Sequence, residues 1–187
     1  MKNLYTERLI LRPWKEDDSK DLYEYAKSDL VGPNAGWPIH ESEEKSKKII
    51  QMFIKNNDTY AIELKSKKKV IGSIGLHNKK SDKTLEHLNQ KEIGYVLNPK
   101  VWGHGFVPEA VMELLNHGFN ELNLDLIWCG HFDFNDRSKR VIEKCGFTFR
   151  FSRKEKLVLL DNKEVTELYY NIFKEDFISK KGDRINK

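Results

Sequence analysis

The chain has 187 residues, of which 33% are charged and 39% are hydrophobic, and its formal net charge is +4. This length suits one domain with a sizeable core. The 33 basic residues are interspersed with 29 acidic ones, which argues against a nucleic-acid-binding surface. No apolar run reaches the roughly 18 residues that a membrane span needs, and no signal region precedes the first strand pattern, so we expect a cytoplasmic protein.

Apolar and polar patterns divide the chain into strands and helices. The stretches that read as strands are residues 4–12, 60–64, 70–77, 92–97, 126–132, 147–158 and 164–173. The stretches with helical spacing are residues 15–27 (capped by Asp17 or Asp18), a helix capped by Ser42, residues 108–120 and residues 136–145. The polar residues after Asp176 are expected to fray, so the domain is predicted at 1–176 with a polar tail at 177–187.

This order predicts a mixed α+β fold with one mostly antiparallel sheet of about seven strands. The clear parallel crossover joins the strands at 92–97 and 126–132 through the helix at 108–120. Cys129 and Cys145 both lie in apolar patterns and read as buried, inert thiols. No His, Cys and Asp cluster has metal-ligand spacing, so no metal is expected.

The loop before the helix at 108–120 has the composition of an anion site. It contains Gly103 and Gly105, which permit positive φ, and Pro108 falls in the first helical turn. Free N–H groups and the helix dipole would then favour a pyrophosphate. No Gly-Lys-Ser/Thr follows, so the loop is not a P-loop, and a third glycine at dinucleotide spacing is missing. An ordinary turn that uses glycines for its geometry is the alternative.

Two motifs resemble those of the GNAT superfamily of acyl-CoA-dependent N-acyltransferases. They are the segment Trp102 to Ala110 and the later Asn135-Asp136-Arg137-Ser138 followed by Glu143 to Phe147. The opening residues Thr6 to Arg12 and the form Trp-Gly-x-Gly-Phe resemble its Rim-like branch, which includes ribosomal-protein N-terminal acetyltransferases. The resemblance implies helices on both faces of the sheet, a splayed parallel strand pair and acetyl-CoA (coenzyme A) as the cofactor.

The resemblance also implies which residues hold the cofactor. They are Val96, Leu97, Trp102, Gly103, His104, Gly105, Phe106, Val107, Asn135 and Ser138. The backbone near Val96 and Leu97 would pair with the pantetheine amides, and one N–H there would polarise the thioester carbonyl. Val107 departs from the small residue that the family prefers.

Catalytic roles are implied for Ser138, Glu92 and Asn135. Many family members carry a tyrosine that protonates the departing thiolate, but the matching position here is Ile142, so Ser138 is the candidate donor. Glu92 is the candidate base, with a solvated strand-end carboxylate as the alternative. Asn135 could orient the substrate, cap the following helix, or do both.

The acceptor site is expected around Trp37, His77 and His131, although Trp37 could equally plug the core, and each histidine is a weaker candidate base. The implied reaction is direct attack of a primary amine, from a small molecule or a protein N-terminus, on acetyl-CoA. A non-catalytic acyl-CoA-binding or regulatory module on the same fold is the alternative. The protein is expected to be a monomer or a homodimer with no nucleic-acid or membrane partner.

Overall fold

Within residues 1–185, which the computed structural model describes, eight strands form one sheet in the order β1-β2-β3-β4-β5-β6-β8-β7. Their bounds are Leu4–Tyr5 (β1), Leu9–Arg12 (β2), Thr59–Leu64 (β3), Lys69–His77 (β4), Gln90–Leu97 (β5), Leu126–Phe132 (β6), Thr148–Leu157 (β7) and Lys163–Phe173 (β8). Neighbouring strands are antiparallel except for β5 and β6. The predicted mixed fold with one parallel pair is confirmed.

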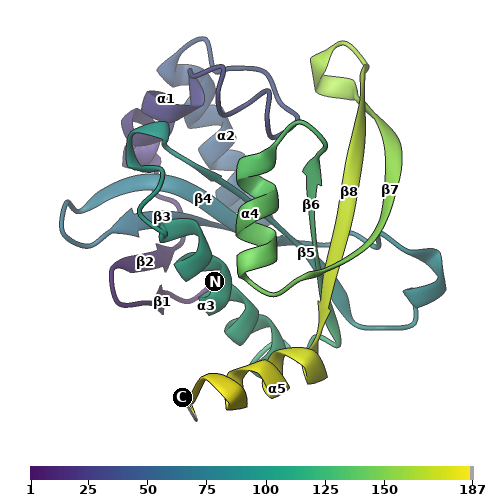
Figure 1. Cartoon of the computed structure of the whole chain (residues 1–187). Helices are drawn as coiled ribbons and strands as arrows, with labels where there is room; N and C mark the ends of the chain where they lie inside the picture. The colour runs from purple at the N-terminus through teal and green to yellow at the C-terminus, as the bar shows by residue number, and fades with distance from the viewer. Residues whose placement is uncertain (186–187) are drawn as a thin grey trace.

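Helices cover both faces of this sheet (Figure 1). They are Ser19–Ala26 (α1), Glu43–Asn56 (α2), Phe106–Asn120 (α3), Asp136–Lys144 (α4) and Lys174–Ile185 (α5). Successive strand residues point to opposite faces. Ile62, Ile71 and Leu97 accordingly enter the core under α3 and α4, while their neighbours Ala61, Val70 and Val96 pack with α1 and α2. Among the described residues, no helix has the length and apolar character to cross a membrane.

The parallel strands β5 and β6 pair over only part of their length. Their register runs from Gln90 opposite Leu126 to Ile93 opposite Cys129. Beyond that point β5 continues to Leu97 and β6 continues to Phe132 without pairing with each other. The two strands therefore part in the middle of the sheet, as the resemblance implied.

The helix that follows β5 buries the apolar stripe expected from its spacing. Val111, Leu114, Leu115 and Phe119 are all fully buried. The helix begins at Phe106, two residues before the predicted start. Ser42 caps α2 as predicted, since its Oγ accepts a hydrogen bond from the Lys45 N–H at 3.2 Å.

Asp18 stands at the start of α1 but makes no side-chain cap there. Its carboxylate instead accepts two hydrogen bonds from Arg12, each at 2.8 Å, and one from the Lys15 N–H. This buried ion pair fastens the beginning of α1 to β2.

Two predictions about the chain ends are wrong. Residues 4–12 form two strands rather than one, because Thr6 turns the chain: its N–H donates to the Leu9 carbonyl, and its Oγ1 accepts from the Leu9 N–H. The residues after Asp176 were expected to fray, but α5 continues to Ile185. Phe177 anchors that helix, since its ring centroid lies 5.2 Å from that of Phe119. Residues 186–187 lie outside the described part of the chain.

Candidate active site

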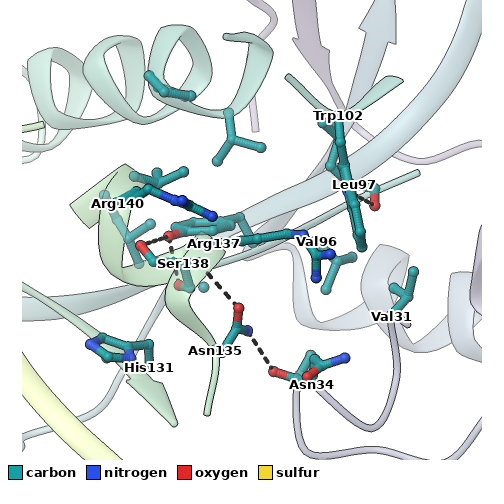
Figure 2. A pocket seen from close by; sticks show the side chains of 18 of the residues that line it. Val31, Asn34, Val96, Leu97, Trp102, His131, Asn135, Arg137, Ser138 and Arg140 are labelled. Atoms are coloured by element: carbon teal, nitrogen blue, oxygen red, sulfur yellow. Dashed lines mark hydrogen bonds between the residues drawn. The ribbon is translucent and has the colours of Figure 1, made fainter. Parts of the chain in front are cut away.

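A cavity of about 620 Å³ occupies the place where β5 and β6 part. Figure 2 shows its wall, with Trp102 and Leu97 on one side and Ser138 and His131 on the other. Residues from both faces of the sheet line it: Glu92 to Leu97 of β5, Gly130 to Phe132 of β6, and side chains from α4 and from the loop between α1 and α2. The cavity thus connects the two faces of the sheet.

The glycine loop before α3 forms one end of the cavity. Gly103 and Gly105 have φ of +83° and +76°, which side chains other than glycine rarely adopt. In the described part of the chain, none of the N–H groups from Gly103 to Val107 donates to a protein acceptor, and α3 has no side-chain cap. These free donors at a helix N-terminus suit a phosphate group.

The β1–β2 hairpin holds this loop in place. The Glu109 carboxylate accepts hydrogen bonds from Thr6 Oγ1 at 2.5 Å and from the Arg8 N–H at 2.8 Å. Arg8 also donates to the His104 carbonyl at 2.9 Å. Burial raises the pKa of Glu109, but these hydrogen bonds outweigh it, so the pKa is lowered and the carboxylate stays charged.

Cations from α4 face the same end of the cavity. Arg137 stacks over the Trp102 ring at 4.5 Å from its centroid, and the Trp102 Nε1 donates to the Leu97 carbonyl at 2.9 Å. Arg140 and Lys144 join Arg137 in the lining. None of these three residues was predicted as a site residue, although their spacing of three and four residues places them on one helix face.

Ser138 and Asn135 meet at the start of α4. The Asn135 Oδ1 accepts from the Ser138 N–H at 3.2 Å, and its Nδ2 donates to the Asn34 carbonyl at 3.2 Å. Figure 2 shows Asn135 linking the helix to the loop that carries Asn34. Asn135 therefore caps α4 and positions that loop, while Ser138 lines the cavity.

The register of β4 and β5 decides which backbone groups face the gap. The Leu76 N–H bonds the Asp58 carbonyl and the Asn98 N–H bonds the Ile71 carbonyl. By the antiparallel alternation, the N–H and C=O of Gly94 and Val96 then point toward β4, whereas those of Tyr95 point toward β6, where pairing has already ended. The backbone groups at the gap are therefore those of Tyr95 and Leu97 rather than those of Val96, whose side chain lines the cavity.

Two carboxylates, Glu92 and Glu167, line the cavity on the face that also carries the loop between α1 and α2. Glu92 accepts from Lys79 and from Ser81, each at 2.9 Å, and the Lys79 Nζ lies 3.6 Å from Glu167. Burial alone would lower the pKa of Lys79, but the two carboxylates raise it, so the ammonium persists. A Cβ at Gly130 would lie 2.7 Å from the Glu167 Oε1, so a side chain there would displace the Glu167 carboxylate.

The other predicted residues lie in different surroundings. His131 lines the cavity but is buried, with Nδ1 2.8 Å from the Phe132 carbonyl and Nε2 3.3 Å from the Tyr170 hydroxyl. His77 lies outside the lining and pairs with Asp58 at 3.2 Å. Trp37 packs under its loop against Gly32 and His40, and His104 also lies outside the lining.

Neither cysteine lines the cavity. Both cysteines are buried, and burial raises the pKa of the Cys129 thiol well above its ordinary value. No group of His, Cys, Asp and Glu within the described residues has the arrangement of a metal site.

The cavity fits acetyl-CoA in each of its parts. Free N–H groups and cations at one end suit the phosphates, and the unpaired strand edges suit the amide-bearing arm. Ser138 and the Tyr95 N–H lie where the gap in the sheet opens. The residues that would hold the cofactor are therefore the glycine loop, the β5 edge and the first turns of α4.

Comparisons with known proteins agree. Residues 8–148 match the family model "Acetyltransferase (GNAT) domain". The protein named "Uncharacterized N-acetyltransferase YoaA" of Bacillus subtilis (strain 168) is 32% identical over 149 residues, which cover 77% of this chain and 81% of that protein.

Solved structures share the fold. A GNAT-family acetyltransferase from Bacillus anthracis superposes with a TM-score of 0.82 at 25% identity, covering 93% of this chain and 99% of the other. The spermidine N-acetyltransferase from Vibrio cholerae, solved with CoA and spermine, has a TM-score of 0.74 at 18% identity and covers 91% and 98% of the two chains. The chain belongs to the GNAT family and is an acetyltransferase that uses acetyl-CoA.

Proposed function

We propose that this enzyme moves the acetyl group of acetyl-CoA to a primary amine by direct attack within a ternary complex. The observation that carries the proposal is a cavity lined from both faces of the sheet. The glycine loop and Ser138 serve the donor, and Glu92 and Glu167 meet the acceptor from the opposite face. Among the described residues, neither cysteine is placed to form a covalent intermediate, because both are buried away from the cavity lining and burial raises the pKa of Cys129.

The donor half stabilises charge where the reaction creates it. Negative charge develops on the thioester oxygen as the amine attacks, and the Tyr95 N–H is the backbone donor for it. The Ser138 hydroxyl serves the departing sulfur. Gly103 to Val107 hold the phosphates through backbone N–H groups, which makes the side chain of Val107 unimportant for binding; it is buried against the core.

The acceptor half favours a cationic molecule. Glu92 and Glu167 both line the cavity, and within the described residues Lys79 is the cation that pairs with both of them. A protonated amine is drawn to such a pair and must then lose a proton before it attacks. Both a small polyamine and a protein N-terminus, as in the Rim-like branch, belong to this class. The cytoplasm, where cysteines without a disulfide are stable, is the proposed location.

Glu92 is the proposed base, and His77 is its rival. The Glu92 carboxylate already accepts hydrogen bonds from Lys79 and Ser81, which oppose its action as a base. The Nδ1 of His77 is paired with Asp58, and its Nε2 would lie 3.4 Å from a Cβ placed on Gly94, a residue of the cavity lining. Glu92→Gln and His77→Gln separate the two, since the base variant loses kcat on saturating amine and the other retains it.

The decisive experiment is thiol release from acetyl-CoA in the presence of spermidine, an aminoglycoside and a peptide with a free N-terminal alanine. Release that depends on one of these amines supports the proposal, and mass spectrometry of the product identifies the acetylated nitrogen. CoA binding without release from any of the three would favour the non-catalytic acyl-CoA-binding module instead. Size-exclusion chromatography on the same sample distinguishes the monomer from the homodimer.

A further inference from the structure

Tyr95 brings a hydroxyl to Ser138 from a different element. Its side chain points from β5 to the α4 face of the sheet, because it alternates with Gly94 and Val96. The Tyr95 Oη lies 2.8 Å from the Ser138 Oγ and 3.3 Å from the Ser138 carbonyl oxygen. Both residues line the cavity, and Figure 2 places Ser138 in its wall beside Asn135.

No other residue in the described lining carries a phenol. Ile142, the position at which the resemblance expects a tyrosine, is 1% exposed and packs into the core. A substitution there could not restore a hydroxyl to the cavity without repacking that core. The hydroxyl pair of Tyr95 and Ser138 is therefore the arrangement on this wall that can meet a departing sulfur.

The reaction forms one C–N bond and breaks one C–S bond. The nitrogen loses a proton, and the sulfur gains one, so the negative charge on sulfur needs a donor while the C–S bond lengthens. A lone serine hydroxyl rotates among several acceptors. A second donor on its oxygen removes that freedom and polarises its O–H, as in other hydrogen-bonded chains.

We propose that Tyr95 is a positioning residue for Ser138, whose phenol donates to the Ser138 Oγ and leaves the serine proton directed into the cavity at the sulfur of CoA. This role rests on the proposed acetyl transfer and adds a residue to it. Burial raises the pKa of Tyr95 well above its ordinary value, so the phenol keeps its proton and remains a donor. Tyr95 itself transfers no proton.

Tyr95→Phe is the direct test because it removes one oxygen and keeps the ring in the core. We expect kcat to fall about tenfold, while the KM for acetyl-CoA and the Kd for CoA change less than about twofold. Ser138→Ala should lose at least as much, and the double variant should match Ser138→Ala alone. Tyr60→Phe, which changes a buried tyrosine outside the cavity lining, is the matched control.

A second measurement needs no acceptor. The thiolate of bound CoA absorbs in the ultraviolet, so titration of the complex gives the pKa of its thiol. Tyr95→Phe and Ser138→Ala should each raise that pKa, by about one unit, a tenfold change in ionisation constant.

The outcomes separate the two proposals. If wild type releases no CoA with any amine, the proposed function fails, while the thiol titration still tests Tyr95. If Tyr95→Phe keeps both the wild-type kcat and the wild-type thiol pKa, the role assigned to Tyr95 is overturned. If the kcat losses of the two single variants multiply in the double variant, Tyr95 acts independently of Ser138. If CoA affinity and thermal stability fall in step with kcat, the role of Tyr95 is structural.

Discussion

Adding one charge at Gly103 tests whether the loop before α3 holds a phosphate. Gly103 has φ of +83°, and a Cβ there would meet nothing within 4 Å. A side chain at positive φ costs about 1–2 kcal/mol, and asparagine and aspartate, which tolerate this region best, incur similar penalties. Gly103→Asn and Gly103→Asp are therefore variants of the same shape that differ by one negative charge.

The size of the difference follows from Coulomb's law. A carboxylate on this loop would lie on the order of 6 Å from a bound phosphate charge, which costs roughly 3 kcal/mol at an effective dielectric constant near 20. We therefore expect Gly103→Asp to bind CoA on the order of 100-fold more weakly than Gly103→Asn.

Calorimetric titration of CoA into both variants measures this ratio, and thermal unfolding checks that they are equally stable. The ratio should shrink in 1 M salt, because the Debye length there is about 3 Å. Equal affinities for the two variants at low salt would refute the placement of the phosphate at this loop.

Three further predictions concern charge and packing. Arg137→Gln should weaken CoA binding about tenfold by calorimetry, because Arg137 lines the cavity, whereas Lys139→Gln, outside the lining, should leave it unchanged. A hydrogen bond from Lys69, the largest cause, lowers the pKa of Glu24 from 4.5 to about 2. The ionised Glu24 therefore contributes about 1 kcal/mol of stability above pH 4.5, and this contribution is lost as the pH falls toward 2. Glu24→Gln should make the midpoint of thermal unfolding less dependent on pH over that range. Phe177→Ala should cost about 3 kcal/mol in denaturant unfolding by removing the anchor of α5, and a loss below about 1 kcal/mol would contradict the docking of that helix.

The sequence predicted the elements whose periodicity comes from burial on a single face. The strand at Leu126–Phe132 was predicted with the observed bounds, and all four residues predicted for the buried stripe of α3 are buried. These patterns repeat over several turns or strand positions, so one ambiguous residue does not obscure them. The glycine loop was found because its shape needs special residue types.

The missed features depend on contacts between distant parts of the chain. Residues 4–12 look like one strand because the turn at Thr6, Glu7 and Arg8 contains no glycine or proline to mark it. The hydrogen bond from the Leu9 N–H to the Thr6 Oγ1, which closes the turn, is invisible in a pattern. Phe177 is a lone aromatic residue in a polar stretch, so its docking on Phe119 could not be read from spacing. Tyr95 reads as a strand residue, and its partner Ser138 lies 43 residues away.

The hydrogen bonds between the β1–β2 hairpin and Glu109 of α3 couple cofactor binding to the protection of the hairpin amides from exchange with solvent. Thr6 and Arg8 reach Glu109 across 103 and 101 residues of sequence. A ligand that favours the ordered loop favours by the same free energy the state in which the hairpin is docked. Amide protons of Leu9 and Leu11 should therefore exchange more slowly with solvent when CoA is bound, although both residues lie outside the cavity lining.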